Sequence, residues 1–305
     1  MYVNSKTMKY VITGASGHTG KIVAERLLGA GHEVITIARK TENIQHLVEK
    51  GAIAAIGDLS DETFLTKTFQ GADAVYALIP PIWIIDESWR AFQRRIGTNI
   101  TNALENAAIK NVVILSSMGS QLAPFGAGPV SGLGEWEQQL QNVRNLNVLA
   151  LRPGYFIENL YAYIPQIKGL GSFGDALLKD LKIPLTHTRD IAEVAAKRLL
   201  ELNFEGFSRE FIGGAQDYTM EEVASILGEA IGLPELQYVQ YPAEDAKKGM
   251  IGAGVPPQIA EGYIQLFDGL NSGSYLADFV RTADNTTKTT LQDFAVEFAF
   301  AYQNS

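Results

Sequence analysis

The stretch Tyr10-Val-Ile-Thr-Gly-Ala-Ser-Gly-His-Thr-Gly20 decides the fold. Its apolar start, residues 10–12, is typical of a buried strand, and residues 21–28 carry apolar side chains at helical spacing. Between them, Gly14-x-x-Gly17-x-x-Gly20 provides a tight turn, a place where a pyrophosphate can approach the backbone, and a close contact of helix and strand. The same glycines also occur in ordinary turns, but a strand before them and a helix after them favour a dinucleotide-binding unit.

Composition narrows the class of protein. Hydrophobic residues make up 46% and charged residues 19% of the 305 residues, as in a globular protein with a substantial core. The net charge of −9, without a basic run, argues against a nucleic-acid partner. The absence of cysteine fits a cytoplasmic protein, and the four histidines lack the paired spacing of a metal site. No apolar run is long enough to cross a bilayer, and residues 1–7 do not resemble a secretory signal.

Two segments concern the choice of nucleotide. The second predicted strand, 33–38, is followed by Arg39-Lys40 and by no acid, which favours NADP with its 2′-phosphate; a solvated basic pair is the alternative. NAD(H) stays open as a second cofactor. After the third strand, 52–56, Asp58 can accept from an adenine amino group while Leu59 packs on the ring, or Asp58 can cap the next turn.

The next two predicted strands are 73–79 and 112–116. Pro80-Pro81 end the first of them beside the crevice at the carboxyl edge of the sheet, where ligands bind in such folds. Ser117 follows the second and either donates to a substrate oxygen or satisfies the strand end. The glycine- and proline-rich segment from Ser117 to Gly134 is expected to be a mobile lid, with the next helix starting at Glu135.

Six segments together resemble the NmrA-like family of atypical short-chain dehydrogenases/reductases: residues 14–20, 39, 57–59, 79–81, 115–117 and 151–159. The resemblance implies a Rossmann-like, doubly wound α/β core over residues 8–155 and a smaller α/β lobe over residues 156–305. We expect elements near 183–214 to return to the core. The family includes NADPH-dependent quinone oxidoreductases, flavin-independent azoreductases, triphenylmethane-dye reductases and redox-sensing regulators.

The resemblance also implies which residues contact NADP(H), with the segment around Tyr155 facing the nicotinamide. These predicted contacts are Gly14, Ala15, Ser16, Gly17, His18, Thr19, Gly20, Arg39, Lys40, Asp58, Leu59, Ile79, Pro80, Pro81 and Tyr155.

One feature of typical short-chain dehydrogenases is missing. These enzymes protonate the substrate oxygen with a Tyr that precedes a Lys by four residues, and here only Tyr2 and Lys6, ahead of the first strand, have that spacing. We therefore expect no ordinary alcohol–ketone chemistry. The candidate catalytic residues are Tyr155 and Ser117; Tyr155 stacks on the nicotinamide, donates a proton or only packs. His187 is expected to be a loop contact without a catalytic partner.

Two functions stay open. In the first, a reductase passes hydride from NADPH to a small conjugated acceptor such as a quinone, azo or related aromatic compound, which delocalises the arriving charge; positioning would supply much of the rate. The aromatic segment 156–174 suits an apolar substrate wall, and ordinary core packing explains it equally well. In the second, the protein is a non-catalytic NADP(H)-binding redox sensor. Self-association into a homo-oligomer also stays open.

Overall fold

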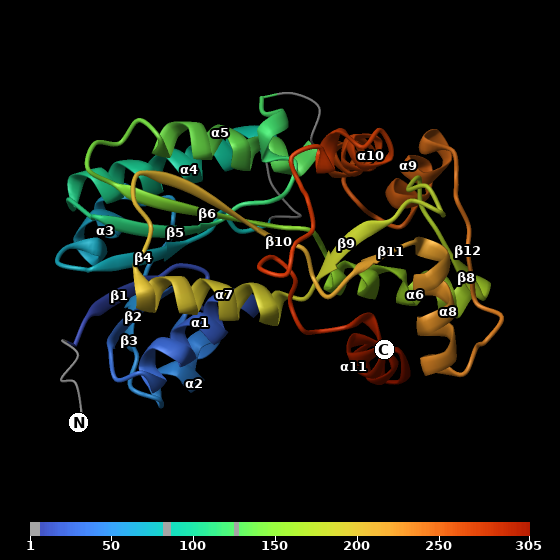
Figure 1. Cartoon of the computed structure of the whole chain (residues 1–305), viewed down its shortest axis with the longest axis horizontal. Helices are drawn as coiled ribbons and strands as arrows, with labels where there is room; N and C mark the ends of the chain where they lie inside the picture. The colour runs from blue at the N-terminus through green and yellow to red at the C-terminus, as the bar shows by residue number, and fades with distance from the viewer. Residues whose placement is uncertain (1–6, 82–86, 125–127) are drawn as a thin grey trace.

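A parallel sheet forms the larger half of the protein (Figure 1). The computed structural model describes residues 7–81, 87–124 and 128–305, and within them the sheet has seven strands in the order β10-β6-β5-β4-β1-β2-β3. Every neighbouring pair in it is parallel. The strand bounds are β1 Lys9–Ile12, β2 Glu33–Ala38, β3 Ile53–Ile56, β4 Ala74–Ala77, β5 Asn111–Leu115, β6 Asn147–Pro153 and β10 Phe207–Ile212. The strand order reverses at β1, which makes the carboxyl end of β1 the topological switch point where such sheets bind ligands.

Helices cover both faces of this sheet (Figure 1). On one face lie α1 (His18–Gly29), α2 (Gln45–Val48) and α7 (Thr188–Glu201), and on the other α3 (Glu62–Phe69), α4 (Trp89–Asn106) and α5 (Ser131–Leu140). Successive side chains of β1 point to opposite faces of the sheet. Tyr10 and Ile12 pack in the apolar cluster that includes α1, and Val11 packs in the cluster that includes α4. Burial on both faces explains the continuous apolar run at residues 10–12. The predicted doubly wound α/β fold is confirmed.

A second apolar core lies in the C-terminal part of the chain, among buried side chains such as Phe173, Leu227 and Phe294. Its strands are β7 Tyr155–Phe156, β8 Ser172–Phe173, β9 Ile183–Thr186, β11 Asp217–Tyr218 and β12 Gln237–Tyr238. Its helices and 3₁₀ turns are η4 Ile157–Tyr163, α6 Ile164–Leu170, α8 Met220–Ile231, α9 Ala243–Gly252, α10 Pro257–Asn271, η5 Ser274–Leu276 and α11 Leu291–Asn304. β9 pairs with β7 and β11 here, whereas α7 and β10, which follow it, lie on the large sheet.

The helix after β5 begins earlier than predicted. α5 starts at Ser131, so Gly132 and Gly134, which indicated a loop, lie in its first turns. A Cβ on Gly132 would lie 2.1 Å from Gln93 Oε1, and one on Gly134 would lie 2.2 Å from the carbonyl oxygen of Ser120. The prediction of a loop up to Gly134 is wrong because these glycines let a helix pack closely against its neighbours. Residues 125–127 of the predicted lid lie outside the described residues.

A buried ion pair ties α5 to the sheet. Arg152, near the end of β6, donates from Nε to Glu137 Oε1 at 3.0 Å and from Nη2 to Oε2 at 2.6 Å. The two side chains are only 1% and 2% exposed. Ser116, just after β5, donates to the same carboxylate at 2.5 Å. Because each buried charge depends on the other, this contact fixes α5 against the carboxyl ends of β5 and β6.

We predict that Glu137→Gln destabilises the protein by about 3–5 kcal/mol, because it removes the close counter-charge of the buried Arg152 guanidinium and leaves only the Asp278 carboxylate, 3.9 Å from Nη1. Glu135→Gln is the matched control, since Glu135 lies on the same helix but pairs with the more exposed Arg90. The control is expected to cost less than about 1 kcal/mol. Urea unfolding of both variants measures the difference, and equal losses would contradict the assignment.

Candidate functional site

The glycine loop lies at the switch point, between β1 and α1. Gly14 has φ +61°, a conformation that favours glycine, and Gly17 donates its N–H to the Gly14 carbonyl at 2.9 Å. A Cβ on Gly20 would lie 2.4 Å from the same carbonyl oxygen, so the first turn of α1 can approach the loop only without that side chain. Gly17 is the N-cap of α1, and no side chain caps this helix. The N–H groups of its first turn are thus available to an anion.

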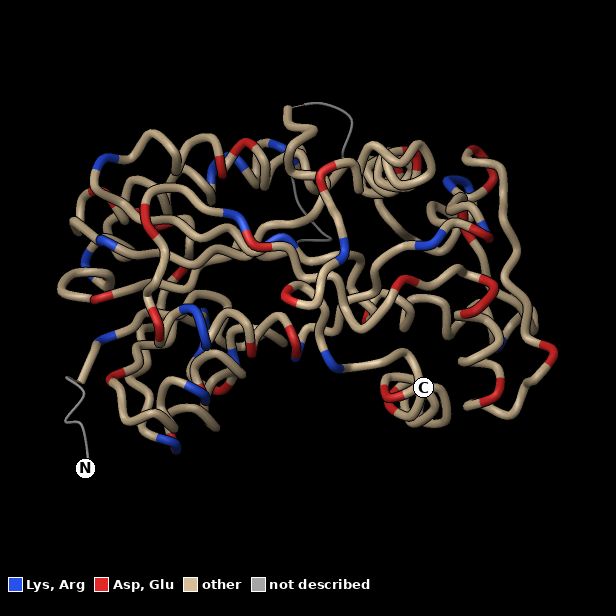
Figure 2. The backbone as a smooth tube through the Cα atoms, viewed as in Figure 1, with Lys and Arg blue, Asp and Glu red and all other residues tan. Residues whose placement is uncertain are grey.

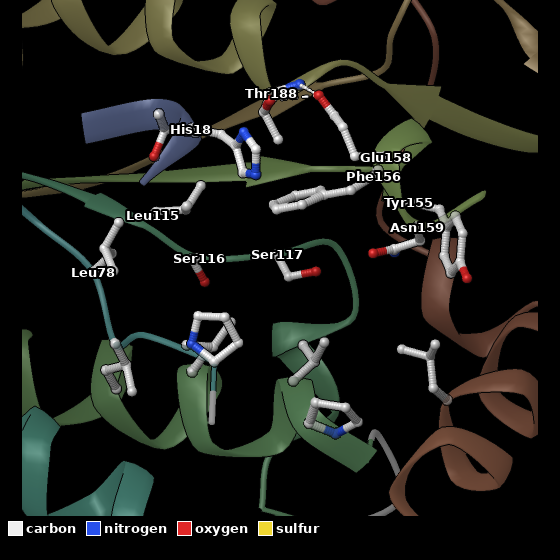
Figure 3. A pocket seen from close by; sticks show the side chains of 18 of the residues that line it. His18, Leu78, Leu115, Ser116, Ser117, Tyr155, Phe156, Glu158, Asn159 and Thr188 are labelled. Carbon is white, nitrogen blue, oxygen red and sulfur yellow. Dashed lines mark hydrogen bonds between the residues drawn. The ribbon is translucent and has the colours of Figure 1, made fainter. Parts of the chain in front are cut away.

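A cavity of about 590 Å³ extends from this loop, past the end of β5, to the C-terminal part of the chain (Figure 3). Ten of the predicted site residues line it: Gly14, Ser16, Gly17, His18, Thr19, Ile79, Pro80, Pro81, Ser117 and Tyr155. The remaining lining is mostly apolar and includes Trp89, Phe156, Tyr161, Tyr263 and Tyr275. The cavity therefore joins the loop to an aromatic wall.

Six predicted residues do not line this cavity. Ala15 and Gly20 belong to the glycine loop but are buried. The other four, Arg39, Lys40, Asp58 and Leu59, follow β2 and β3 at the same edge of the sheet. Hydrogen bonds from Ser60 hold the pKa of Asp58 below its ordinary value, and the nearby guanidinium groups of Arg39 and Arg95 lower it further. Asp61, not Asp58, caps α3.

The two serines after β5 point to different partners. Ser116 is buried and bonded to Glu137, as described above, whereas the hydroxyl of Ser117 lies 3.3 Å from that of Tyr275. Both serines line the cavity (Figure 3). Ser117 is therefore the one whose hydroxyl faces the aromatic wall.

Tyr155 lies at the boundary between the core sheet and the smaller lobe, in β7. Burial raises its pKa well above the ordinary value, and the charge of Asp175 and the nearby Tyr263 raise it further. A tyrosine so shifted is a weaker acid than a free one, so Tyr155 suits a hydrogen bond or a ring contact better than proton donation. Tyr2 and Lys6, the pair with the Tyr-to-Lys spacing of typical short-chain dehydrogenases, lie outside the described residues.

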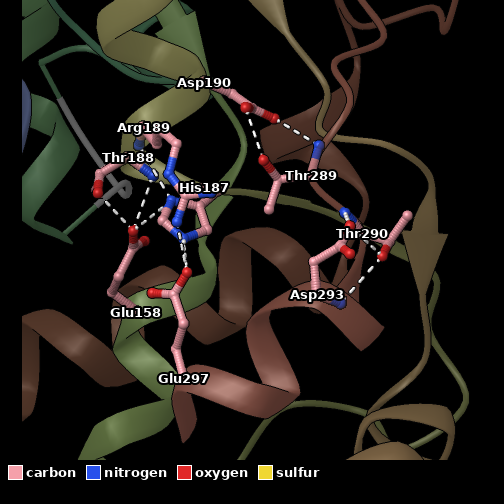
Figure 4. A network of polar contacts seen from close by, with 9 residues as sticks. All are labelled: Glu158, His187, Thr188, Arg189, Asp190, Thr289, Thr290, Asp293 and Glu297. Carbon is pink, nitrogen blue, oxygen red and sulfur yellow. Dashed lines mark hydrogen bonds and ion pairs between the residues drawn. The ribbon is translucent and has the colours of Figure 1, made fainter.

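The structure also brings together residues whose link is not visible in the sequence (Figure 4). Glu158 and Thr188 line the cavity, and Glu158 Oε1 accepts from the Thr188 N–H at 2.9 Å. His187 Nδ1 lies 3.0 Å from the same oxygen. His187, expected to be a loop contact without a catalytic partner, thus has Glu158 as a contact partner. These residues come from η4 and the start of α7, so only the tertiary fold unites them.

The charges of this group shift both titrations. Burial alone would lower the pKa of His187, but the hydrogen bond with Glu158 and the charges of Glu158 and Glu297 outweigh it and raise the pKa. Burial alone would raise the pKa of Glu158, but hydrogen bonds from His187 and Thr188 hold it below its ordinary value. The charged forms of both groups are thus favoured together.

Across residues 7–81, 87–124 and 128–305, no three His, Asp or Glu side chains gather as metal ligands, and no helix is long and apolar enough to cross a membrane. Figure 2 shows Lys and Arg interspersed with Asp and Glu along both halves of the backbone.

A doubly wound sheet, with a glycine loop and the uncapped start of a helix at its switch point, defines a Rossmann-type, nucleotide-binding class of protein. Within that class, the chain belongs to the NmrA-like family, whose family model matches residues 6–294. It is 28% identical over 293 residues to an NAD(P)H azoreductase of Xenophilus azovorans, covering 96% of this chain and 97% of the relative. The family resemblance drawn from the sequence is confirmed.

Three solved structures share the fold over almost the whole chain. The first is an NADPH-dependent quinone oxidoreductase of Escherichia coli complexed with NADPH (TM-score 0.75, 23% identity, 94% of this chain and 99% of that one). The second is the triphenylmethane reductase of Citrobacter sp. complexed with NADP(H) (TM-score 0.77, 20% identity, 95% of this chain and 99% of that one). The third is NmrA, a negative transcriptional regulator, in complex with NADP (TM-score 0.68, 14% identity, 96% of this chain and 91% of that one). At these identities the likeness establishes the fold.

We predict that Gly20→Ala lowers the free energy of unfolding by about 1–3 kcal/mol, because the new Cβ overlaps the Gly14 carbonyl oxygen. Gly29→Ala is the matched control in the same helix. No atom lies within 4 Å of its Cβ position, so alanine there is expected to stabilise the protein by about 0.5–1 kcal/mol. Thermal unfolding distinguishes the two, and destabilisation by both would show a general intolerance of α1 instead.

The contribution of His187 to the stability of the folded protein is expected to depend on pH. Asn is a good N-cap residue, so His187→Asn keeps the cap of α7 while it removes the titrating ring. Because the folded state raises the pKa of His187, its stabilisation is complete below the ordinary histidine pKa and is lost as the pH rises through the raised value. The stability difference between natural protein and variant should therefore shrink as the pH rises from below the ordinary histidine pKa of 6.5 through the raised value. Urea unfolding across that range measures it; a constant difference would contradict the prediction.

Proposed function

We propose that this protein is an NADPH-dependent reductase that transfers hydride to a small conjugated acceptor, such as a quinone, azo or related aromatic compound. The observation that carries the proposal is the continuous cavity between the glycine loop and the aromatic wall. The azoreductase relative and the two reductase structures support it.

The residues at the sheet edge fit NADP(H). The Gly14–Gly20 loop and the uncapped first turn of α1 would hold the pyrophosphate. Arg39, with Lys40, would hold the 2′-phosphate, and Asp58-Leu59 the adenine. Ile79, Pro80 and Pro81 would lie along the cofactor toward its nicotinamide end. When bound, the dihydronicotinamide supplies the hydride.

The aromatic wall defines the acceptor. Rings at Trp89, Phe156, Tyr263 and Tyr275 present flat apolar surface, which favours a planar conjugated molecule over a polar alcohol or sugar. The described lining includes neither Lys nor Arg, and Tyr155 is a weakened acid. An acceptor that delocalises the arriving charge suits such a lining, and positioning supplies much of the rate.

The alternative is a protein that binds NADP(H) without turnover and reports the redox state to a partner. The likeness to the regulator solved with NADP favours it. The large apolar cavity favours the reductase, because a sensor needs the nucleotide site alone.

The deciding experiment follows NADPH oxidation by nicotinamide absorbance with a panel of quinones, azo dyes and triphenylmethane dyes, with NADH in parallel. We expect turnover with at least one class of acceptor. Tight NADPH binding with no oxidation across the panel would contradict the reductase and support the sensor.

Arg39→Ala should weaken NADPH binding by about 10- to 100-fold, because it removes a charged hydrogen bond to the 2′-phosphate, and should leave NADH binding unchanged. Arg144→Ala is the control, since Arg144 is exposed and precedes the amino end of β6, at the opposite edge of the sheet. Fluorescence titration with both nucleotides measures the constants. An equal loss for NADPH and NADH would contradict the role of Arg39.

A further inference from the structure

One wall of the cavity carries a charged pair. Glu158, from η4, lines the cavity together with Thr188 (Figure 3), and its side chain is 14% exposed. Its Oε1 accepts from the N–H and the hydroxyl of Thr188 and lies 3.0 Å from His187 Nδ1. Its Oε2 is buried and has no hydrogen-bond partner among the described residues. One carboxylate oxygen is therefore held by the protein, and the other is unsatisfied.

The far side of the imidazole faces a second carboxylate. His187 Nε2 lies 3.5 Å from Oε1 of Glu297, on α11, and Glu297 also pairs with Arg189 (Figure 4). Glu297 is 42% exposed, whereas His187 is only 6% exposed. His187 thus connects a cavity-lining carboxylate with one at the surface.

The contacts of Nδ1 distinguish two protonation states. A neutral imidazole accepts the Arg189 N–H at Nδ1, over 3.0 Å, and so caps α7. In that state the Nδ1 lone pair also faces Glu158 Oε1, which is repulsive. An imidazolium instead donates Nδ1–H to Glu158, and Glu297 stabilises its charge from the other side. The groups facing His187 are Glu158 on η4, Glu297 on α11 and Arg189 on α7; the ring of Phe294, on α11, packs edge-on against it.

We propose that Glu158 and His187 form the proton-delivery pair of this site. The inference rests on the proposed reductase function and names the proton source that the missing Tyr–Lys pair leaves open.

An azo acceptor takes up one hydride and one proton. The C4–H bond of the dihydronicotinamide breaks as an N–H bond forms on one azo nitrogen, so the nicotinamide is oxidised and the acceptor reduced by two electrons. The second nitrogen gains the negative charge and takes a proton from the Glu158 carboxyl, which His187 Nδ1–H has protonated. With a quinone, a carbonyl oxygen takes that proton. The imidazole keeps its Nε2–H beside Glu297, and Nδ1 regains its proton through Glu158 from water that enters the cavity once the product has left.

The other acidic groups near the cavity are poorer donors. Burial raises the pKa of Tyr275 and of Tyr155 above the ordinary value, so both hold their protons more tightly. Glu137 binds the Arg152 guanidinium through both oxygens and does not line the cavity. The Glu158–His187 pair combines a position in the cavity wall with an Nδ1–H that lies within reach of the carboxylate.

The first test needs no turnover. The chain has four histidines, so NMR titration of the full protein with labelled histidine follows each ring, and His187→Asn assigns the relevant signal. We expect His187 to titrate above its ordinary value in the natural protein and lower in Glu158→Gln, which retains an oxygen for the Thr188 N–H. An unchanged titration in Glu158→Gln would overturn the pair.

The second test is the pH profile of kcat with an acceptor that the natural protein reduces. We expect kcat to fall as the pH rises through the pKa of the pair. Glu158→Gln should lower kcat about 10²-fold and abolish this limb, and His187→Asn should move the limb to lower pH, because Glu158 alone loses its proton earlier. Glu193→Gln, an exposed α7 residue paired with Arg26, is the matched control and should keep the natural profile.

The outcomes separate the two proposals. No turnover with any acceptor would overturn the reductase, and the proton-delivery role with it. Turnover with the natural alkaline limb and a kcat within about twofold in Glu158→Gln would overturn the proton-delivery role alone, because a general acid contributes more than that.

Discussion

The site depends on the distance between the first turn of α1 and the loop that follows β1. With no side chain at Gly20, the helix end comes so close to the Gly14 carbonyl that a Cβ would lie only 2.4 Å from it. This contact places the positive end of the helix dipole at the point where the strand order reverses. From that point the cavity follows the carboxyl edge of the sheet toward the smaller lobe.

Short sequence patterns were sufficient to predict the features that depend only on residues close together in the chain. The strand at residues 10–12, the basic pair after β2 and the prolines after β4 could be placed because each is short, apolar or conformationally restricted. The start of α5 could not, since Gly132 and Gly134 have the same composition as a loop, and only Gln93 and Ser120 show why glycine is needed there. The contact of Glu158 with His187 was hidden for a similar reason: it joins two elements well separated in sequence.

The cavity is built where the chain passes between its two halves. Gly154 to Phe156 lead out of β6, and Ile183 to Thr188 lead from β9 back to α7; both segments line the cavity. His187 is the cap of the returning helix and contacts the cavity wall and α11 at once. A change in its charge therefore acts on the junction of the two halves as well as on the cavity.

The return of α7 and β10 to the large sheet bears on how the chain can be divided. A fragment ending at residue 155 would keep six of the seven strands but lose β10, leaving the backbone groups of β6 unpaired along a free edge. It would also uncover the apolar face on which Ile191, Ala195 and Leu199 pack. A break at this boundary would thus leave an incomplete sheet with an exposed apolar face, so the two cores depend on one continuous chain.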